Sequence, residues 1–158
     1  MAPIYGYAPK GERLRLSVSR RRGKNTTLLS SMTLGGMGPS LAVQGATTAR
    51  LFETYVEKVL APGLCEGQVV VMDNLGAHRP KRVKDLIEAR KARSCELLYL
   101  PSYSPDYNPI EEAFAKIKHL LREASARSKK ALLEAMGLAL SAVSAQDAQG
   151  FFEHAGYH

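Results

Sequence analysis

Asp73 is the first residue whose type and position indicate chemistry. It follows four apolar, strand-forming residues at 69–72 (VVVM) and precedes Asn74. A continuous apolar run of this length is typical of a strand that is buried on both faces. The carboxyl end of such a strand is the edge where open α/β sheets place their binding sites. The same Asp could instead turn the chain or cap the next helix, and its position leaves both interpretations open.

Glu111 is the second candidate. Asn108 can cap a helix that begins at Pro109, which makes Glu111 the third helical residue. A Glu at that position can reach back to the amide of the cap, or it can project toward a neighbouring strand end. Glu112 is rotated by about 100° from Glu111, so both cannot face one point. We therefore expect Glu112 to face solvent.

Two carboxylates that reach one point from separate elements repel each other. Without a cation, one of them tends to hold a proton. A divalent metal removes this conflict, and ligation by oxygen alone suits Mg²⁺ or Mn²⁺. Two such metals about 4 Å apart can stabilise the attacking and leaving oxygens of phosphoryl transfer. Asp73 and Glu111 together therefore predict a metal site for phosphate chemistry.

Basic residues near these carboxylates are suited to a nucleic-acid substrate. Arg79 and Lys81 follow Asp73, and Lys118 shares a helical face with Glu111. His78 could contact a phosphate or orient Asp73, although a single loop histidine is often incidental. The formal charge of +7 and the pI near 9.5 favour a polyanionic partner, but many basic proteins share them. A solvated lysine is an equal alternative for Lys118.

The remaining pattern predicts a layered α/β or α+β protein, with helices over a mixed sheet. Alternation and apolar runs predict strands at 14–18, 26–34, 40–46, 69–72 and 96–100. Apolar residues at helical spacing predict helices at 48–60, 80–91, 109–124 and 129–143, with Phe151, Phe152 and Tyr157 docking back on the body. The glycines at 35, 36 and 38 precede a second extended run, so they predict a hairpin turn and not a phosphate-binding loop.

Composition excludes several classes of protein. A length of 158 residues is typical of one domain. No apolar run is long enough to span a bilayer, and residues 1–15 lack the apolar core of a secretory signal. Cys65 and Cys95 form no CxxC pair, which argues against a disulfide framework or a structural zinc site. We expect a cytoplasmic protein with no membrane partner.

Two longer stretches resemble a known family. VVVMDNLGAHRP and LPSYSPDYNPIEEAFAKIK, with 37 residues between Asp73 and Glu111, resemble the DDE catalytic domain of bacterial insertion-sequence transposases of the mariner superfamily. The resemblance extends to YGYAPKGERL and to the closing FFEHAGYH. It implies a ribonuclease H-like fold in which Asp, Asp and Glu bind two magnesium ions. It also implies an enzyme that nicks DNA at transposon ends and joins the freed 3′ hydroxyl to target DNA. Asp73 would be the second carboxylate and Glu111 the third.

One departure from the family pattern concerns the first carboxylate. No Asp precedes Asp73, and the only upstream acids, none of them in the family's context, are Glu12, Glu53, Glu57 and Glu66. The resemblance therefore implies that residues 1–158 are one truncated catalytic domain without its first, central strand. An upstream segment or reading-frame product would supply that strand and its Asp, and a homodimer is a further expectation.

The absent strand has a structural consequence. Strands on either side of it would expose backbone groups that each cost on the order of 1–3 kcal/mol if buried without a partner. The strand at 11–18 (GERLRLSV) is a stand-in whose arginines suit a central strand poorly. Three hypotheses remain: a domain active once the Asp is supplied, a remnant that binds DNA non-specifically, and a nuclease in which Glu12 substitutes as a ligand.

Overall fold

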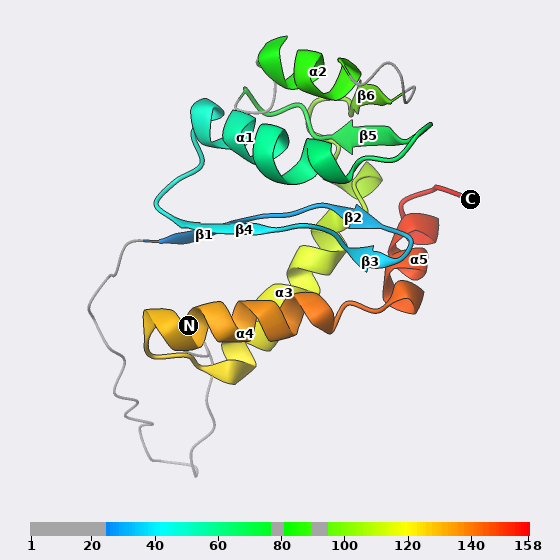
Figure 1. The fold of residues 1–158 in the computed structure, drawn as a ribbon. Helices are drawn as coiled ribbons and strands as arrows, with labels where there is room; N and C mark the ends of the chain where they lie inside the picture. Colours follow the sequence, from blue (N-terminus) through cyan, green and yellow to red (C-terminus); the bar gives the residue numbers. More distant parts are fainter. Residues whose placement is uncertain (1–24, 77–80, 90–94) are drawn as a thin grey trace, which may run out of the picture.

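The computed structural model describes residues 25–76, 81–89 and 95–158 of the chain. A β-hairpin lies at its centre (Figure 1). Strand β1 (Thr26–Leu29) pairs antiparallel with β4 (Leu41–Gln44), from Thr26↔Gln44 to Leu29↔Leu41. Strands β2 (Met32–Thr33) and β3 (Gly36–Met37) form its tip. The predicted hairpin is confirmed, although it is broken into two ladders. The predicted strand at 14–18 lies outside the described residues.

The glycine-rich tip has a backbone that requires glycine. Gly36 has a φ of 119°, a conformation that residues with a Cβ rarely adopt. A Cβ at Gly36 would also lie 3.0 Å from the carbonyl oxygen of Val143. The tip therefore packs closely on the C-terminal part of the chain.

A second, parallel pair of strands carries Asp73. Strand β5 (Val69–Met72) pairs with β6 (Glu96–Tyr99), from Val69↔Glu96 to Met72↔Tyr99. Parallel strands need a crossover connection, and helix α2 (Lys81–Glu88) lies in the segment that connects β5 to β6.

The prediction that β5 is buried on both faces is wrong. Val69 on β5 and Leu98 on β6 are each 54% exposed. Met72, Val70 and Leu97 pack into a core with α1 (Ala49–Tyr55) and α2. Among the described residues, these helices cover one face of the pair only, so the alternate side chains on the other face stay exposed.

The predicted helix at 48–60 is confirmed. Thr48 caps α1 by accepting a hydrogen bond from the backbone of Leu51 at 3.2 Å. The helix continues through a π-helical stretch (Val56–Leu60) and ends in a 3₁₀ turn (Ala61–Gly63). The hydroxyl of Tyr55 donates to the carbonyl of Pro39 at 3.1 Å, which fixes α1 to the hairpin. Burial raises the pKa of Tyr55.

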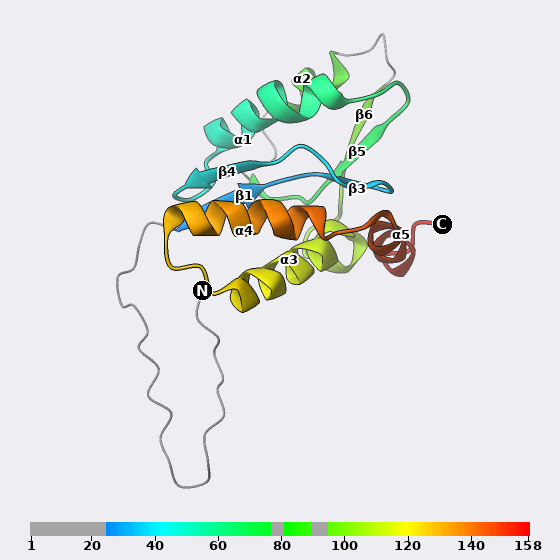
Figure 2. The ribbon, with the colours of Figure 1, turned by 60° about the horizontal axis from the view of Figure 1, so that its bottom comes forward.

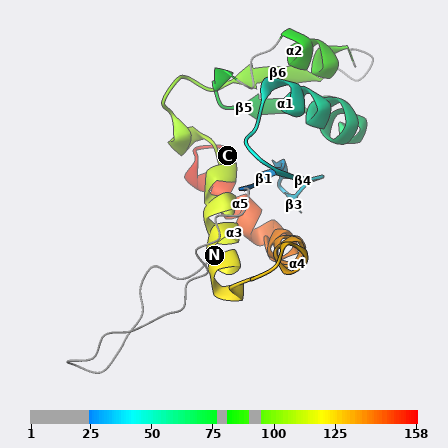
Figure 3. The ribbon, with the colours of Figure 1, turned by 90° about the vertical axis from the view of Figure 1, so that its left-hand side faces the viewer.

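Three helices form the opposite layer (Figures 2 and 3). They are α3 (Ile110–Ala124), α4 (Lys129–Ser141) and α5 (Ala145–His154). Their core includes Ile117, Met136 and Ala139, and it contacts the hairpin through Leu28, Met32 and Ala42. Leu29 belongs to the other core, with α1 and α2. The hairpin therefore lies between two helical layers, and alternate residues of β1 face each one.

Helix α5 was not predicted from the sequence, which indicated only that aromatic residues of the tail dock on the body. Ser144 and Asp147 form a capping box at its start. Among the described helices, none combines the length and apolar content that crossing a bilayer requires.

The core between α3 and α4 gives a test of this packing. Ile117 is 2% exposed, and Ile117→Ala should lower the free energy of unfolding by about 2–5 kcal/mol because it removes buried methyl groups and leaves a cavity. Leu138→Ala, at a residue 75% exposed on α4, should change it by less than about 0.5 kcal/mol. Urea unfolding followed by circular dichroism measures both, and equal losses would contradict the packing described.

Candidate active site

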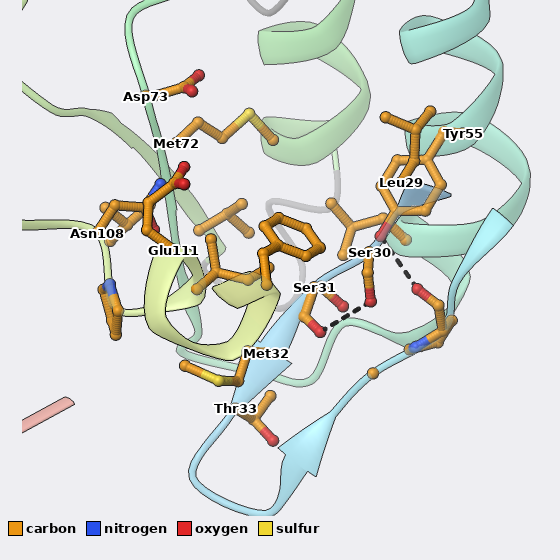
Figure 4. A pocket seen from close by; sticks show the side chains of 18 of the residues that line it. Leu29, Ser30, Ser31, Met32, Thr33, Tyr55, Met72, Asp73, Asn108 and Glu111 are labelled. Atoms are coloured by element: carbon orange, nitrogen blue, oxygen red, sulfur yellow. Dashed lines mark hydrogen bonds between the residues drawn. The ribbon is translucent and has the colours of Figure 1, made fainter. Parts of the chain in front are cut away.

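Asp73 and Glu111 line one cavity of about 530 Å³. Figure 4 shows their carboxylates on the same side of it. Asp73 follows the end of β5 and is half-buried, whereas Glu111 lies in the first turn of α3 and is exposed. The structure thus brings together the two carboxylates that the sequence singled out.

The loops after β5 and β6 hold Asp73 at the edge of the sheet. The amide of Leu100 donates to the carbonyl of Met72 at 2.8 Å, which extends the parallel pairing beyond β6. The side-chain amide of Asn74 donates to the hydroxyl of Ser102 at 3.1 Å and joins the two loops. The other polar atom of that side chain, Asn74 Oδ1, is buried without a hydrogen-bond partner in the described structure. An unsatisfied buried acceptor beside Asp73 is a feature that a ligand can explain.

Glu111 is placed by a proline-rich loop. A 3₁₀ turn (Pro105–Tyr107) precedes Asn108, and α3 starts directly after Pro109. The backbone of Glu111 donates to the carbonyl of Asn108 at 3.1 Å. No side-chain hydrogen bond caps α3, so the prediction that Asn108 caps this helix through its side chain is wrong. Asn108 lines the cavity instead. The alternative in which Glu111 projects from the helix start fits the structure.

The predicted DNA contacts lie apart from the cavity or outside the described residues. His78 and Arg79 belong to the part of the chain that is not described. Lys81 begins α2 and Lys118 lies on α3, and both are exposed without lining the cavity. Lys118 lies about 10 Å along the helix from Glu111, at 1.5 Å per residue. Both lysines are therefore open to solvent and lie away from the two carboxylates.

Two other basic side chains, both on α2, are paired with acids. Arg82 lies 3.9 Å from Glu53 and 3.5 Å from Glu57, and Lys84 lies 3.9 Å from Glu88. Exposed pairs of this kind contribute little to stability, but they reduce the positive charge that α2 offers to a polyanion. The positive charge that α2 presents is therefore smaller than its sequence suggests.

The C-terminal segment holds the start of α3. The Lys116 ammonium group donates to Asp147 Oδ2 at 2.5 Å and to the carbonyl of Ala142 at 3.1 Å. The Tyr157 hydroxyl donates to the carbonyl of Tyr107 at 2.8 Å, just before α3. The sequence did not identify this contact set, although the Ser144–Asp147 spacing of the capping box is a readable signal for the helix that makes it.

Glu112 and the closing aromatic residues also belong to this contact set. The prediction that Glu112 faces solvent is wrong, because it is half-buried and contacts His154 Nδ1 on α5. Phe152 and Tyr157 stack edge to face, with ring centroids 5.9 Å apart, and both line the cavity. The C-terminal segment therefore supplies one wall of the candidate site.

Asp73 and Glu111 offer oxygen donors of the kind that hard divalent metals prefer. No group of three His, Cys, Asp or Glu side chains that could hold a metal occurs among residues 25–76, 81–89 and 95–158. The donor set fits such a metal in type, and the two carboxylates would be two of its ligands. A further oxygen ligand would have to come from outside these residues.

The family comparison decides which proteins the chain is related to. The DDE superfamily endonuclease family matches residues 1–133. The chain belongs to this family. The match includes both Asp73 and Glu111, and it confirms the DDE-type resemblance read from the sequence.

Solved structures show the same fold. The Mos1 transposase paired-end complex with the left transposon end matches with a TM-score of 0.72 and 18% identity, over 97% of this chain and 47% of that one. The Mos1 strand transfer complex gives 0.70 and 18%, over 98% and 46%. The Mos1 mariner paired-end complex with Mn gives 0.69 and 18%, over 95% and 48%. This chain thus spans less than half the length of the chains it matches. No curated protein sequence matches it.

The Lys116–Asp147 contact predicts a pH effect. The hydrogen bond from Lys116, followed by that from the Ser144 backbone, lowers the pKa of Asp147 from 3.8 to about 2. Because the pKa of this carboxyl is lower in the folded than in the unfolded chain, its ionised form stabilises the fold at pH values above 3.8. This contribution to stability is lost as the pH falls through about 2. Lys116→Met should therefore lower the melting temperature at pH 5 to 7, and the difference from the unsubstituted chain should shrink between pH 4 and 2. A difference that stays constant across this range would contradict the ion pair.

Proposed function

We propose that this chain carries part of a metal-dependent centre for DNA strand cleavage and strand transfer, with Mg²⁺ or Mn²⁺ held by Asp73 and Glu111. The observation that carries the proposal is that both carboxylates line one cavity, from a strand end and a helix start. The family match supports an endonuclease activity. The fold likeness to Mos1 transposase complexes, one with transposon-end DNA and one with Mn, supports DNA as substrate and a divalent metal as cofactor.

The chemistry divides between the metal and the chain. A bound divalent metal would stabilise charge on the attacking and leaving oxygens of a DNA phosphate. Asp73 and Glu111 would hold it, each fixed by its element: the paired end of β5 and the first turn of α3. His78, Arg79, Lys81 and Lys118 would contact the DNA backbone. Their contribution would be sequence-independent, because phosphate contacts position DNA without reading bases.

The proposal includes a catalytic domain that is completed from outside. We assign residues 1–158 to one truncated domain of ribonuclease H-like type, in which an upstream segment or reading-frame product supplies the first strand and the first Asp. The absence of a third acidic ligand among the described residues supports this incompleteness. The same observation favours the second candidate function, an inactive remnant that binds DNA non-specifically. Metal-dependent nicking in the presence of the upstream product would separate the two.

The carboxylates are tested by isosteric substitution. With the upstream product co-expressed, Asp73→Asn and Glu111→Gln should each slow nicking of supercoiled plasmid in Mg²⁺ by about 100-fold or more, because metal stabilisation of the transition state is worth several kcal/mol. Glu112→Gln, at the neighbouring residue, should keep nearly full activity because Gln can still contact His154. If Asp73→Asn nicks DNA at the normal rate, the assignment of Asp73 is wrong.

The DNA contacts are tested by salt dependence. Lys118 is exposed and forms no ion pair within the described residues, whereas Lys116, two residues earlier, is bound to Asp147. Lys118→Ala should reduce the slope of log affinity against log salt by about 0.9, the value for one phosphate contact on duplex DNA. Lys116→Met should leave the slope unchanged. Filter binding of a random-sequence duplex at several salt concentrations measures both, and equal slopes for Lys118→Ala and the unsubstituted chain would exclude a phosphate contact by Lys118.

A further inference from the structure

The two cysteines of the chain lie against each other, although 30 residues separate them in sequence. The thiol of Cys95 donates a hydrogen bond to the carbonyl oxygen of Cys65, with the sulfur 3.2 Å from that oxygen. Both residues carry thiols in this structure. The pair lies where β5 and β6 begin, at the opposite end of these strands from Asp73.

Gln68 holds the two cysteines together. Its backbone amide donates to the carbonyl of Cys65 at 3.3 Å, and its side-chain oxygen accepts from the amide of Cys65 at 2.7 Å, which closes a turn over 65–68. The carbonyl of Gln68 accepts from the amide of Glu96, the residue after Cys95, at 3.1 Å. The register of β5 and β6 therefore fixes the place where Cys95 meets this turn.

The two thiols differ in their access to solvent. Cys95 is 4% exposed and packs in a core with Leu64, whereas Cys65 is exposed. A buried cysteine is often no more than a small apolar side chain. Here its sulfur also contacts the backbone of a second cysteine, and the thiol of that second residue is open to solvent. An accessible thiol beside a second, resolving cysteine is the arrangement found in cysteines that respond to oxidation.

The separation of the two residues suits a disulfide. A carbonyl oxygen lies about 2.4 Å from its own Cα, so the sulfur of Cys95 lies at most about 5.6 Å from the Cα of Cys65. Disulfides usually join residues whose Cα atoms are about 4.4–6.8 Å apart. The cross-link requires rotation of the Cys65 side chain toward Cys95, and this side chain is exposed and not held by core packing.

We infer that Cys65 and Cys95 form a modification site for low-molecular-weight disulfides such as oxidised glutathione. The Cys65 thiolate attacks the small disulfide, and one of its sulfurs leaves as a thiol with the proton that Cys65 gave up. The Cys95 thiolate then attacks the sulfur of Cys65, and the second small thiol leaves in the same way. Two thiols of the chain are oxidised to one disulfide, and one small disulfide is reduced to two thiols. This inference does not rest on the proposed function.

The cross-link would restrain the part of the chain that carries Asp73. It would tie the turn before β5 to the residue before β6, and it would enclose β5, Asp73 and α2 in one loop. A disulfide chiefly restricts the unfolded chain, so this part should open less often when it is oxidised. Because Cys65 is exposed, small thiols can reach the bond and reverse the modification.

The first test treats the full chain with oxidised glutathione and follows its mass. The unsubstituted chain should lose two hydrogen atoms, about 2 Da, and retain no glutathione. Digestion without reduction should give one pair of peptides joined through Cys65 and Cys95, and dithiothreitol should restore the original mass. A chain that keeps a glutathione, or that forms disulfides only between two molecules, would overturn the inference.

Single substitutions separate the roles of the two thiols. Cys95→Ser should keep one glutathione on Cys65, because the resolving thiol is lost. Cys65→Ser should stay unmodified, because the remaining thiol is 4% exposed in the folded chain. Circular dichroism would confirm that both variants are folded. Equal modification of the two folded variants would contradict the assignment of Cys65 as the attacking thiol and Cys95 as the resolving one.

The melting temperature shows whether the bond fits the folded chain. Oxidation should raise the melting temperature of the unsubstituted chain by about 5 °C or more, and it should leave that of Cys95→Ser unchanged. Hydrogen exchange of the amides of β5 and α2 should slow on oxidation, while that of α4 stays the same. An unchanged or lower melting temperature of the cross-linked chain would show that the bond distorts the fold, and the inference would be wrong.

Discussion

Within the described residues, β1 and β5 each have one unpaired edge, and these edges are the constraint on which the rest of the structure depends. A backbone group that is buried without a hydrogen-bond partner costs on the order of 1–3 kcal/mol. The N–H and C=O groups of two facing strand edges must therefore pair with each other, pair with another strand or stay open to solvent. Here they border a cavity, and the carboxylates lie at its margin. Val69 and Leu98 are exposed for a different reason, because the described helices cover only the other face of the β5–β6 pair.

The C-terminal segment contributes to the site from a distance in sequence. Lys116, Glu112 and the loop before α3 are each contacted by residues of α5 or of the tail that follows it. These contacts fix the first turn of α3, which carries Glu111. Helix α5 also packs close to β3 at the hairpin tip, so the hairpin, α3 and the tail form one unit around the cavity. The position of Glu111 thus depends on residues more than 30 positions later in the chain.

Much of this arrangement could be predicted from the sequence because its signals are local. The apolar run at 69–72, the glycines of the hairpin and the proline before α3 each fix their own element. Helix α5 was missed because its apolar stripe is short, although its capping box is present. The burial of β5 was predicted wrongly because burial depends on what covers a strand, and that is not encoded in the strand. The partners of Glu112 and Lys116 could not be predicted either, since they depend on how α5 packs against α3.

The central claim is that Asp73 and Glu111 hold one metal centre together. The most direct measurement is a double-mutant cycle on Mn²⁺ affinity, by calorimetry, for the chain with its upstream partner. Two ligands of one centre should be coupled, so that Asp73→Asn and Glu111→Gln each weaken binding strongly and the double variant loses much less than the sum of the two effects. Strictly additive effects, or unchanged affinity in either single variant, would show that the two carboxylates do not share a metal.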